Sequence, residues 1–96
     1  MKNKNVSLYK CIQIVEKLKK QKKKIVMTNG CFDIIHSGHV DYLVKSKKLG
    51  DILIVAVNSD KSIKKLKGRS RPVNSLKNRI KVLNSMSFID FIISFN

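Results

Sequence analysis

Apolar residues recur at helical spacing in some parts of the chain and form short continuous runs in others, and each of these patterns predicts an element. Residues 7–20 carry apolar side chains at helical spacing with lysines opposite, which predicts an amphipathic helix capped by Ser7. The apolar runs at residues 25–27 and 52–57 show no alternation, which is typical of strands buried on both faces of a parallel sheet. Between them, a helical pattern ends at Gly50, a natural C-cap.

The second half of the chain continues the alternation of helices and strands. A short helix is expected at residues 62–66, followed by a basic loop at residues 67–72. Apolar positions from Leu76 to Met86 predict another helix with Ser75 as its cap, and residues 88–95 predict a third strand. This order predicts an α/β fold, a Rossmann-like parallel sheet flanked by helices.

The chain has the length of one small domain, and we interpret residues 1–96 as a single unit. Residues 1–24 form its N-terminal helix and a basic connection, and residues 25–96 form a partial Rossmann-like core. No apolar run approaches the ~20 residues that cross a bilayer, and a signal-peptide core is lacking, so we expect a cytoplasmic protein without membrane contact. Cys11 and Cys31 are too few for a disulfide framework or a zinc site.

Charge is the strongest signal in the composition. Lys and Arg number 21 against 6 Asp and Glu, for a net charge of +15. Such a charge favours polyanions, but the chain lacks aromatic stacking motifs and a recognition-helix signature. We therefore interpret the lysines mainly as a solvated surface and do not expect nucleic-acid binding.

The chemistry is concentrated in residues 28–39, between the first strand and the second helix. Ligands of parallel sheets bind beyond the carboxyl ends of the strands, where this stretch is expected. Gly30 permits a strained turn or close backbone approach, and Gly38 stands at a helix start that attracts phosphate. His36 and His39, three residues apart, are expected on one face, where imidazole N–H groups can stabilise phosphoryl charge. These two histidines are too few for a zinc site, so no protein metal site is predicted.

The sequence then shows a more specific likeness. Asn29-Gly30-Cys31-Phe32-Asp33 followed by His36-Ser37-Gly38-His39 resembles the G-x-F-D-x-x-H-x-G-H signature of the cytidylyltransferase-like nucleotidyltransferases, whose Rossmann-like fold carries a HIGH-type motif. Residues 27–33, 49–51, 55–60, 66–68 and 70–74 are similar to the heptose 1-phosphate adenylyltransferase domain of ADP-heptose synthases.

The resemblance implies a reaction. A nucleotidyl group, AMP from ATP, is transferred to a sugar phosphate such as heptose 1-phosphate, and pyrophosphate is released, with Mg²⁺ accompanying the nucleotide. This reaction belongs to ADP-heptose synthesis for the lipopolysaccharide core. Two alternatives remain: a cytidylyltransferase acting on glycerol 3-phosphate or a related alcohol phosphate, and a truncated nucleotide-binding remnant without catalysis. The resemblance also implies further strands and an I-S-T-T signature after Asn96, and a shortened sheet favours a homodimer.

The resemblance assigns roles to residues. His36, His39 and Lys67 are the expected catalytic residues, with Lys64 or Lys65 as alternatives to Lys67. Asp60 and Arg79 are candidates for substrate or phosphate contact. The expected nucleotide-binding residues are Thr28, Asn29, Gly30, Cys31, Phe32, Asp33 and Gly38.

Simpler interpretations stay open for several of these residues. Asp33 is also a suitable cap for a turn, and Asp60 a turn former after its strand. Lys67 is also suited to a solvated surface, and Arg79 to an exposed helix face.

Overall fold

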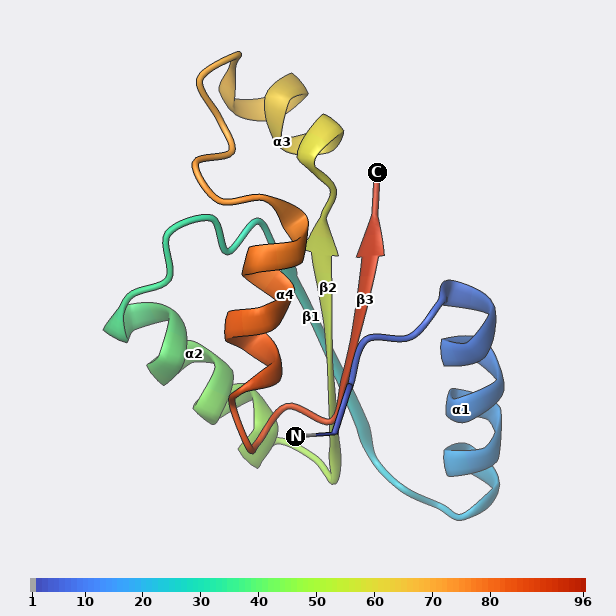
Figure 1. Ribbon diagram of the computed structural model, residues 1–96. Helices are drawn as coiled ribbons and strands as arrows, with labels where there is room; N and C mark the ends of the chain where they lie inside the picture. The colour runs from blue at the N-terminus through green and yellow to red at the C-terminus, as the bar shows by residue number, and fades with distance from the viewer. Residues whose placement is uncertain (1) are drawn as a thin grey trace.

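Three parallel strands form the centre of the fold, in the order β1-β2-β3. The computed structural model describes residues 2–96 and is drawn in Figure 1. Along the chain the elements are α1 (Leu8–Lys20), β1 (Ile25–Gly30), α2 (Ser37–Lys48), β2 (Ile52–Asn58), α3 (Asp60–Lys67), α4 (Leu76–Asn84) and β3 (Phe91–Phe95). The predicted α/β, Rossmann-like architecture is confirmed.

The helices are distributed unequally around the sheet. α1 lies against one face, α2 and α4 cover the other, and α3 stands beyond the carboxyl ends of the strands (Figure 1). Serine side chains cap three helices: Ser7 accepts from the N–H of Lys10, and Ser59 and Ser75 cap α3 and α4 in the same way. Each cap satisfies an N–H that would otherwise lack a partner at a helix start.

Each face of the sheet has its own hydrophobic cluster. The face under α2 and α4 buries Phe32, Leu43, Leu53, Val55, Val57, Leu83, Ile89 and Ile92. The face under α1 buries Cys11, Ile54, Ala56 and Ile93. Successive residues of β2 therefore enter opposite clusters, and because both faces are covered the strand is apolar throughout, as its sequence indicates.

The structure corrects three expectations. β1 runs to Gly30 rather than ending at Met27, because residues 28–30 pair with β2 as far as Val57. β1 is an edge strand rather than a fully buried one, and Met27 is 56% exposed. Leu49, which belongs to the apolar helical pattern before Gly50, is 65% exposed beyond the end of α2.

The third strand is also shorter than predicted, since β3 begins at Phe91. The carboxylate of the preceding Asp90 accepts from the backbone N–H of Leu53 at 2.7 Å and forms an ion pair with Lys47. The N-terminal segment follows the outer side of β3, where Val6 N–H donates to Ile92 O at 2.9 Å. Within residues 2–96, no helix has the length and apolar character needed to cross a membrane.

Candidate functional site

A small polar pocket opens at the carboxyl edge of the sheet. It has a volume of about 200 Å³. Its walls come from the loop after β1, the start of α2, the end of α3 and the loop before α4. The lining residues are Cys31, Phe32, Asp33, Ile34, His36, His39, Lys67 and Arg71.

The two histidines form a reciprocal cap at the start of α2. His36 is the N-cap residue, and its Nδ1 accepts from the backbone N–H of Gly38 at 3.0 Å. In return, Nδ1 of His39 accepts from the backbone N–H of His36 at 3.2 Å. The two rings lie 4.2 Å apart between centroids. Imidazoles thus take the places that Ser and Glu occupy in an ordinary capping box.

This cap determines which ring nitrogen can face a ligand. An Nδ1 that accepts a hydrogen bond carries no proton, so each neutral ring carries its proton on Nε2 and can donate from there. Burial lowers the pKa of His39 below its ordinary value, and the charges of His36 and Lys67 lower it further. The neutral form of His39 is therefore favoured, as its accepting Nδ1 requires.

The glycines of the motif make room for side chains. A Cβ on Gly38 would lie 2.8 Å from Cε1 of His36, so only glycine leaves the capping ring in place. A Cβ on Gly30 would lie 2.9 Å from Cε2 of Phe32. Phe32 has φ of 49°, an uncommon value for a non-glycine residue. This backbone turn places its ring in the core, edge-on to His39 with centroids 5.7 Å apart.

Asp33 ties the loop after β1 to the loop before α4. Its carboxylate accepts from the N–H of Val73 and Asn74 at 2.9 and 2.8 Å and from Nε of Arg71 at 2.7 Å. Burial raises the pKa of Asp33, but the hydrogen bonds from Asn74, Val73 and Arg71 and the Arg71 charge outweigh it and lower the pKa to about 2. Asp33 therefore shapes the site as an ionised anchor.

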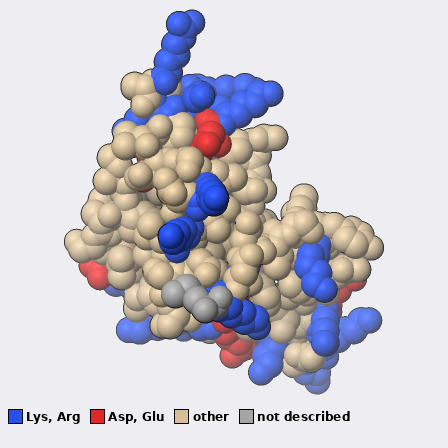
Figure 2. Space-filling model, in the orientation of Figure 1, with Lys and Arg blue, Asp and Glu red and all other residues tan. Residues whose placement is uncertain are grey.

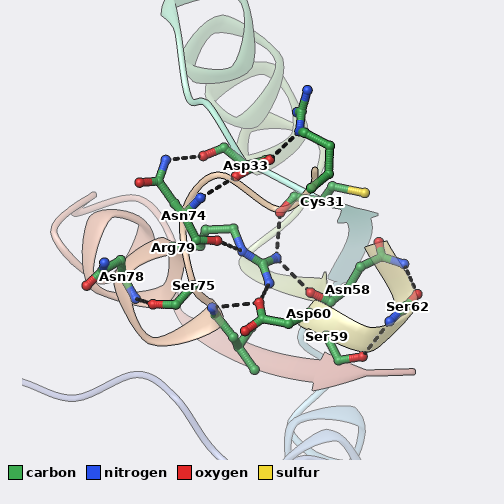
Figure 3. A network of polar contacts seen from close by, with 12 residues as sticks. Cys31, Asp33, Asn58, Ser59, Asp60, Ser62, Asn74, Ser75, Asn78 and Arg79 are labelled. Atoms are coloured by element: carbon green, nitrogen blue, oxygen red, sulfur yellow. Dashed lines mark hydrogen bonds and ion pairs between the residues drawn. The ribbon is translucent and has the colours of Figure 1, made fainter. Parts of the chain in front are cut away.

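Arg79 is the centre of a second, buried network (Figure 3). Its side chain has 0% exposure, and its Nη2 lies 2.6 Å from Oδ1 of Asp60. Nη1 donates to the carbonyls of Cys31 and Asn58, and Nε donates to that of Asn74. One guanidinium therefore joins the loops that follow β1 and β2 to the start of α4.

The neighbours of Arg79 complete this network. Oδ1 of Asp60 also accepts from the N–H of Leu76, the first residue of α4, at 2.9 Å. The Asn58 amide donates to the Ser62 hydroxyl at 2.8 Å, which joins the end of β2 to α3. Side chains from distant segments therefore converge around one point at the sheet edge, as Figure 3 shows.

Comparison with known proteins identifies this arrangement. Residues 27–95 match the family described as Cytidylyltransferase-like. The chain belongs to the cytidylyltransferase-like family. The matched segment runs from the first strand through the histidine cap to the last strand, so it includes every residue that lines the pocket.

Curated relatives are similar over most of this chain. The bifunctional protein HldE of Pasteurella multocida is 55% identical over 84 residues, which cover 88% of this chain and 18% of that protein. The bifunctional protein HldE of Haemophilus influenzae is 57% identical over 81 residues, which cover 84% of this chain and 17% of that protein. The chain therefore spans about a fifth of the length of these relatives.

A solved structure has the same fold. The lipopolysaccharide core biosynthesis protein of Thermoplasma volcanium is 35% identical, with a TM-score of 0.71. The similarity covers 77% of this chain and 59% of that one.

The structure brings together most of the residues that the sequence singled out. His36, His39, Lys67, Cys31, Phe32 and Asp33 line one pocket, and Gly38 supports the histidine cap. Two predicted nucleotide-binding residues lie elsewhere. Thr28, whose hydroxyl is hydrogen-bonded to that of Tyr42, and Asn29 line a separate hollow beside Met27 and Phe95.

Two site residues differ from expectation. Arg79 was expected to contact substrate or to lie on an exposed helix face, yet it is buried with its Nε and both terminal nitrogens occupied. Arg71, which was not predicted as a site residue, lines the pocket beside the histidines. The sequence feature that could have indicated Arg71 is its place in the basic loop before α4, but the sequence alone does not distinguish Arg71 from nearby Arg69.

The cations of the pocket belong to a larger basic surface. Figure 2 shows Lys and Arg gathered over α3 and its following loop at the top, and again around α1 on the right. In α3 these are Lys61, Lys64, Lys65 and Lys67. Positive potential at the mouth of the pocket attracts anionic ligands over distances up to a Debye length, about 8 to 10 Å.

In the part of the chain that the structure describes, the side chains form no metal cage. Among residues 2–96, no group of three His, Cys, Asp or Glu side chains comes close enough to hold an ion. The carboxylate at the pocket, Asp33, is already occupied by three donors. The site instead presents imidazole, ammonium and guanidinium donors, which match phosphate oxygens.

Proposed function

We propose that residues 1–96 act as a nucleotidyltransferase domain, which transfers AMP from ATP to a sugar phosphate such as heptose 1-phosphate. Membership of the cytidylyltransferase-like family supports nucleotidyl transfer. The relatives named bifunctional protein HldE, the likeness to ADP-heptose synthases and the Thermoplasma lipopolysaccharide core protein support a sugar phosphate acceptor.

In the proposed reaction, a phosphate oxygen of the acceptor attacks the α-phosphorus of ATP. A new bond forms between that oxygen and phosphorus, and the bond from the α-phosphorus to the bridging oxygen breaks. Pyrophosphate leaves with the electron pair of the broken bond. The reaction needs no covalent enzyme intermediate, so the protein contributes by positioning the reactants and stabilising charge.

The observation that carries the proposal is the histidine cap. Because both Nδ1 atoms accept from backbone N–H groups, the two Nε2–H groups are free to donate to phosphate oxygens. The donors are set before the ligand arrives, so little reorganisation accompanies the reaction. Lys67, on the same pocket, would neutralise charge on the leaving pyrophosphate.

A divalent cation fits this family as a companion of the nucleotide, and we propose Mg²⁺. Mg²⁺ is usually held largely by substrate phosphates and water, which agrees with a pocket whose side chains form no metal cage. It would enter as Mg–ATP and would neutralise charge on the triphosphate.

The test is pyrophosphate release by the purified chain with ATP, Mg²⁺ and heptose 1-phosphate. His36→Ala and His39→Ala are expected to lower turnover by about 100-fold or more. Ser37→Ala, in the same helical turn, is the control and should retain activity. Parallel reactions with CTP and glycerol 3-phosphate test the cytidylyltransferase alternative. ATP binding without turnover on any acceptor would support a nucleotide-binding remnant instead.

We also propose that the chain self-associates as a homodimer. Among residues 2–96 the outer edge of β1 has no partner strand, and Met27 on that strand is largely exposed. Free strand edges favour association. Sedimentation equilibrium of the purified chain tests this proposal, and a monomer at all concentrations would contradict it.

A further inference from the structure

Arg71 has a guanidinium that is held on one side and free on the other. Its Nε donates to Oδ2 of Asp33 at 2.7 Å, and its side chain stays 32% exposed while that of Asp33 is 2% exposed. Among residues 2–96, no protein acceptor is hydrogen-bonded to either of its terminal nitrogens, Nη1 and Nη2. Arg79 is the opposite case, because both of its terminal nitrogens donate to protein oxygens.

The loop that carries Arg71 is attached to the loop after β1 by other hydrogen bonds besides this ion pair. Asp33 also accepts from the backbone N–H groups of Val73 and Asn74, and the Asn74 amide donates to the carbonyl of Asp33 at 2.6 Å. These bonds already join the loop after β1 to the loop before α4. The bond to Arg71 therefore has a further consequence, which is to set the direction of the guanidinium.

Arg71 lines the pocket that His36, His39 and Lys67 also line. Apart from Cys31 and the anchored Asp33, every ionisable side chain of this pocket can thus donate hydrogen bonds to phosphate oxygens. A guanidinium offers two parallel N–H groups that match two oxygens of one phosphate, which an ammonium does not. Because Asp33 orients the group in advance, less side-chain entropy is lost on binding.

We propose that Arg71 is a phosphate-binding residue of this site, which holds one phosphate group through Nη1 and Nη2 while Asp33 positions it. This inference rests on the proposed nucleotidyl transfer, since that reaction brings phosphate groups into the pocket. The phosphate belongs either to the triphosphate of ATP or to the sugar phosphate. Both have the same chemistry, and the experiment below separates them.

The experiment measures binding of Mg–ATP, inorganic pyrophosphate and heptose 1-phosphate to the full chain by calorimetry. Arg71→Ala and Arg71→Lys are compared with Arg69→Ala, an exposed arginine two residues away that does not line the pocket. Arg71→Ala is expected to weaken the ligand it holds about 10- to 100-fold. Arg71→Lys should recover little of this loss because it lacks the fork, and Arg69→Ala should change binding by less than about threefold, since exposed charges act weakly.

The pattern of losses identifies the phosphate. Weaker binding of ATP and pyrophosphate with unchanged sugar phosphate assigns Arg71 to the triphosphate, and the reverse pattern assigns it to the acceptor. Equal binding by the Arg71 and Arg69 variants would overturn the inference while leaving the proposed function intact. Failure of the unaltered chain to bind any of these ligands would overturn both.

Two further measurements separate binding from folding. Arg71→Gln retains an amide that can donate to Asp33, so it should preserve the thermal unfolding midpoint while losing phosphate affinity. Adding guanidinium ion at millimolar concentration to Arg71→Ala should restore part of the lost affinity, which a purely structural contact would not show. Full affinity in Arg71→Gln would contradict the inference.

Discussion

The two faces of the sheet contrast in both packing and chemistry. The face under α2 and α4 buries a large cluster that includes Phe32, whose ring contacts His39. The face under α1 buries a smaller cluster, and Met27 and Phe95 remain 56% and 37% exposed beside a hollow of about 520 Å³. The pocket therefore lies above the face with the larger buried cluster, so its loops are held by core contacts as well as by hydrogen bonds.

The largest expected effect comes from removing the buried arginine above the packed face. Arg79→Met leaves the carbonyls of Cys31 and Asn58 without their donor, so we expect the free energy of unfolding to fall by about 4 to 5 kcal/mol. Urea denaturation measures this change. Lys77→Met, an exposed charge on the same helix, is the matched control and should change stability by less than about 0.5 kcal/mol. Equal effects of the two variants would show that the network does not hold the loops.

Neighbouring residues of β2 test the two clusters directly. Leu53 and Ile54 are both fully buried but face the α2/α4 and α1 clusters respectively. We expect Leu53→Ala to lower the free energy of unfolding by about 3 to 4 kcal/mol and Ile54→Ala by about 2 to 3 kcal/mol, because the smaller cluster around Ile54 can relax more easily around the cavity. Urea midpoints at constant m-value provide the comparison. A larger loss at Ile54 would reverse the proposed contrast.

The pH dependence of stability tests the role of Asp33 in holding together the loops that line the pocket. The pKa of Asp33 is lowered from its ordinary 3.8 to about 2, so between these values the unfolded chain binds more protons than the folded one. Stability should therefore fall as pH drops from about 4 to 2, with Asp33 accounting for about 2 kcal/mol. Asp33→Asn should flatten this part of the pH profile, and the exposed Asp41→Asn should leave it unchanged. A profile that keeps its slope in Asp33→Asn would contradict the anchor role.

The helix caps of the two faces give the smallest effects. Gly38→Ala places a Cβ against the His36 ring, so the cap is lost while alanine favours the helix. The net change in stability should be under about 0.5 kcal/mol, yet ATP binding should weaken because Nε2 is displaced. Ser7→Ala removes the α1 cap on the other face and should cost about 1 kcal/mol with ATP binding unchanged. NMR of the imidazole protons reports the ring displacement, and an unmoved His36 ring in Gly38→Ala would contradict the steric argument.

Local features were predictable because they depend on residues close in sequence. The amphipathic pattern of α1, the serine caps at Ser7 and Ser75, and the buried run of β2 all follow from spacing within a few residues. The pairing of His36 with His39 is equally local, since three residues separate them at a helix start. The sequence therefore determined the element order, the fold class and the centre of the pocket.

Long-range contacts decided the rest. The Arg79 guanidinium bonds to a carbonyl 48 residues away, and Arg71 bonds to a carboxylate 38 residues away. Nothing in the local sequence shows that the first arginine is buried as a structural centre while the second retains free donors. The edge position of β1 and the separation of Thr28 from the histidine pocket also depend on sheet order and strand register. Side-chain roles at this site were therefore determined by tertiary packing, because burial depends on which segments meet and periodicity indicates only which face of an element is apolar.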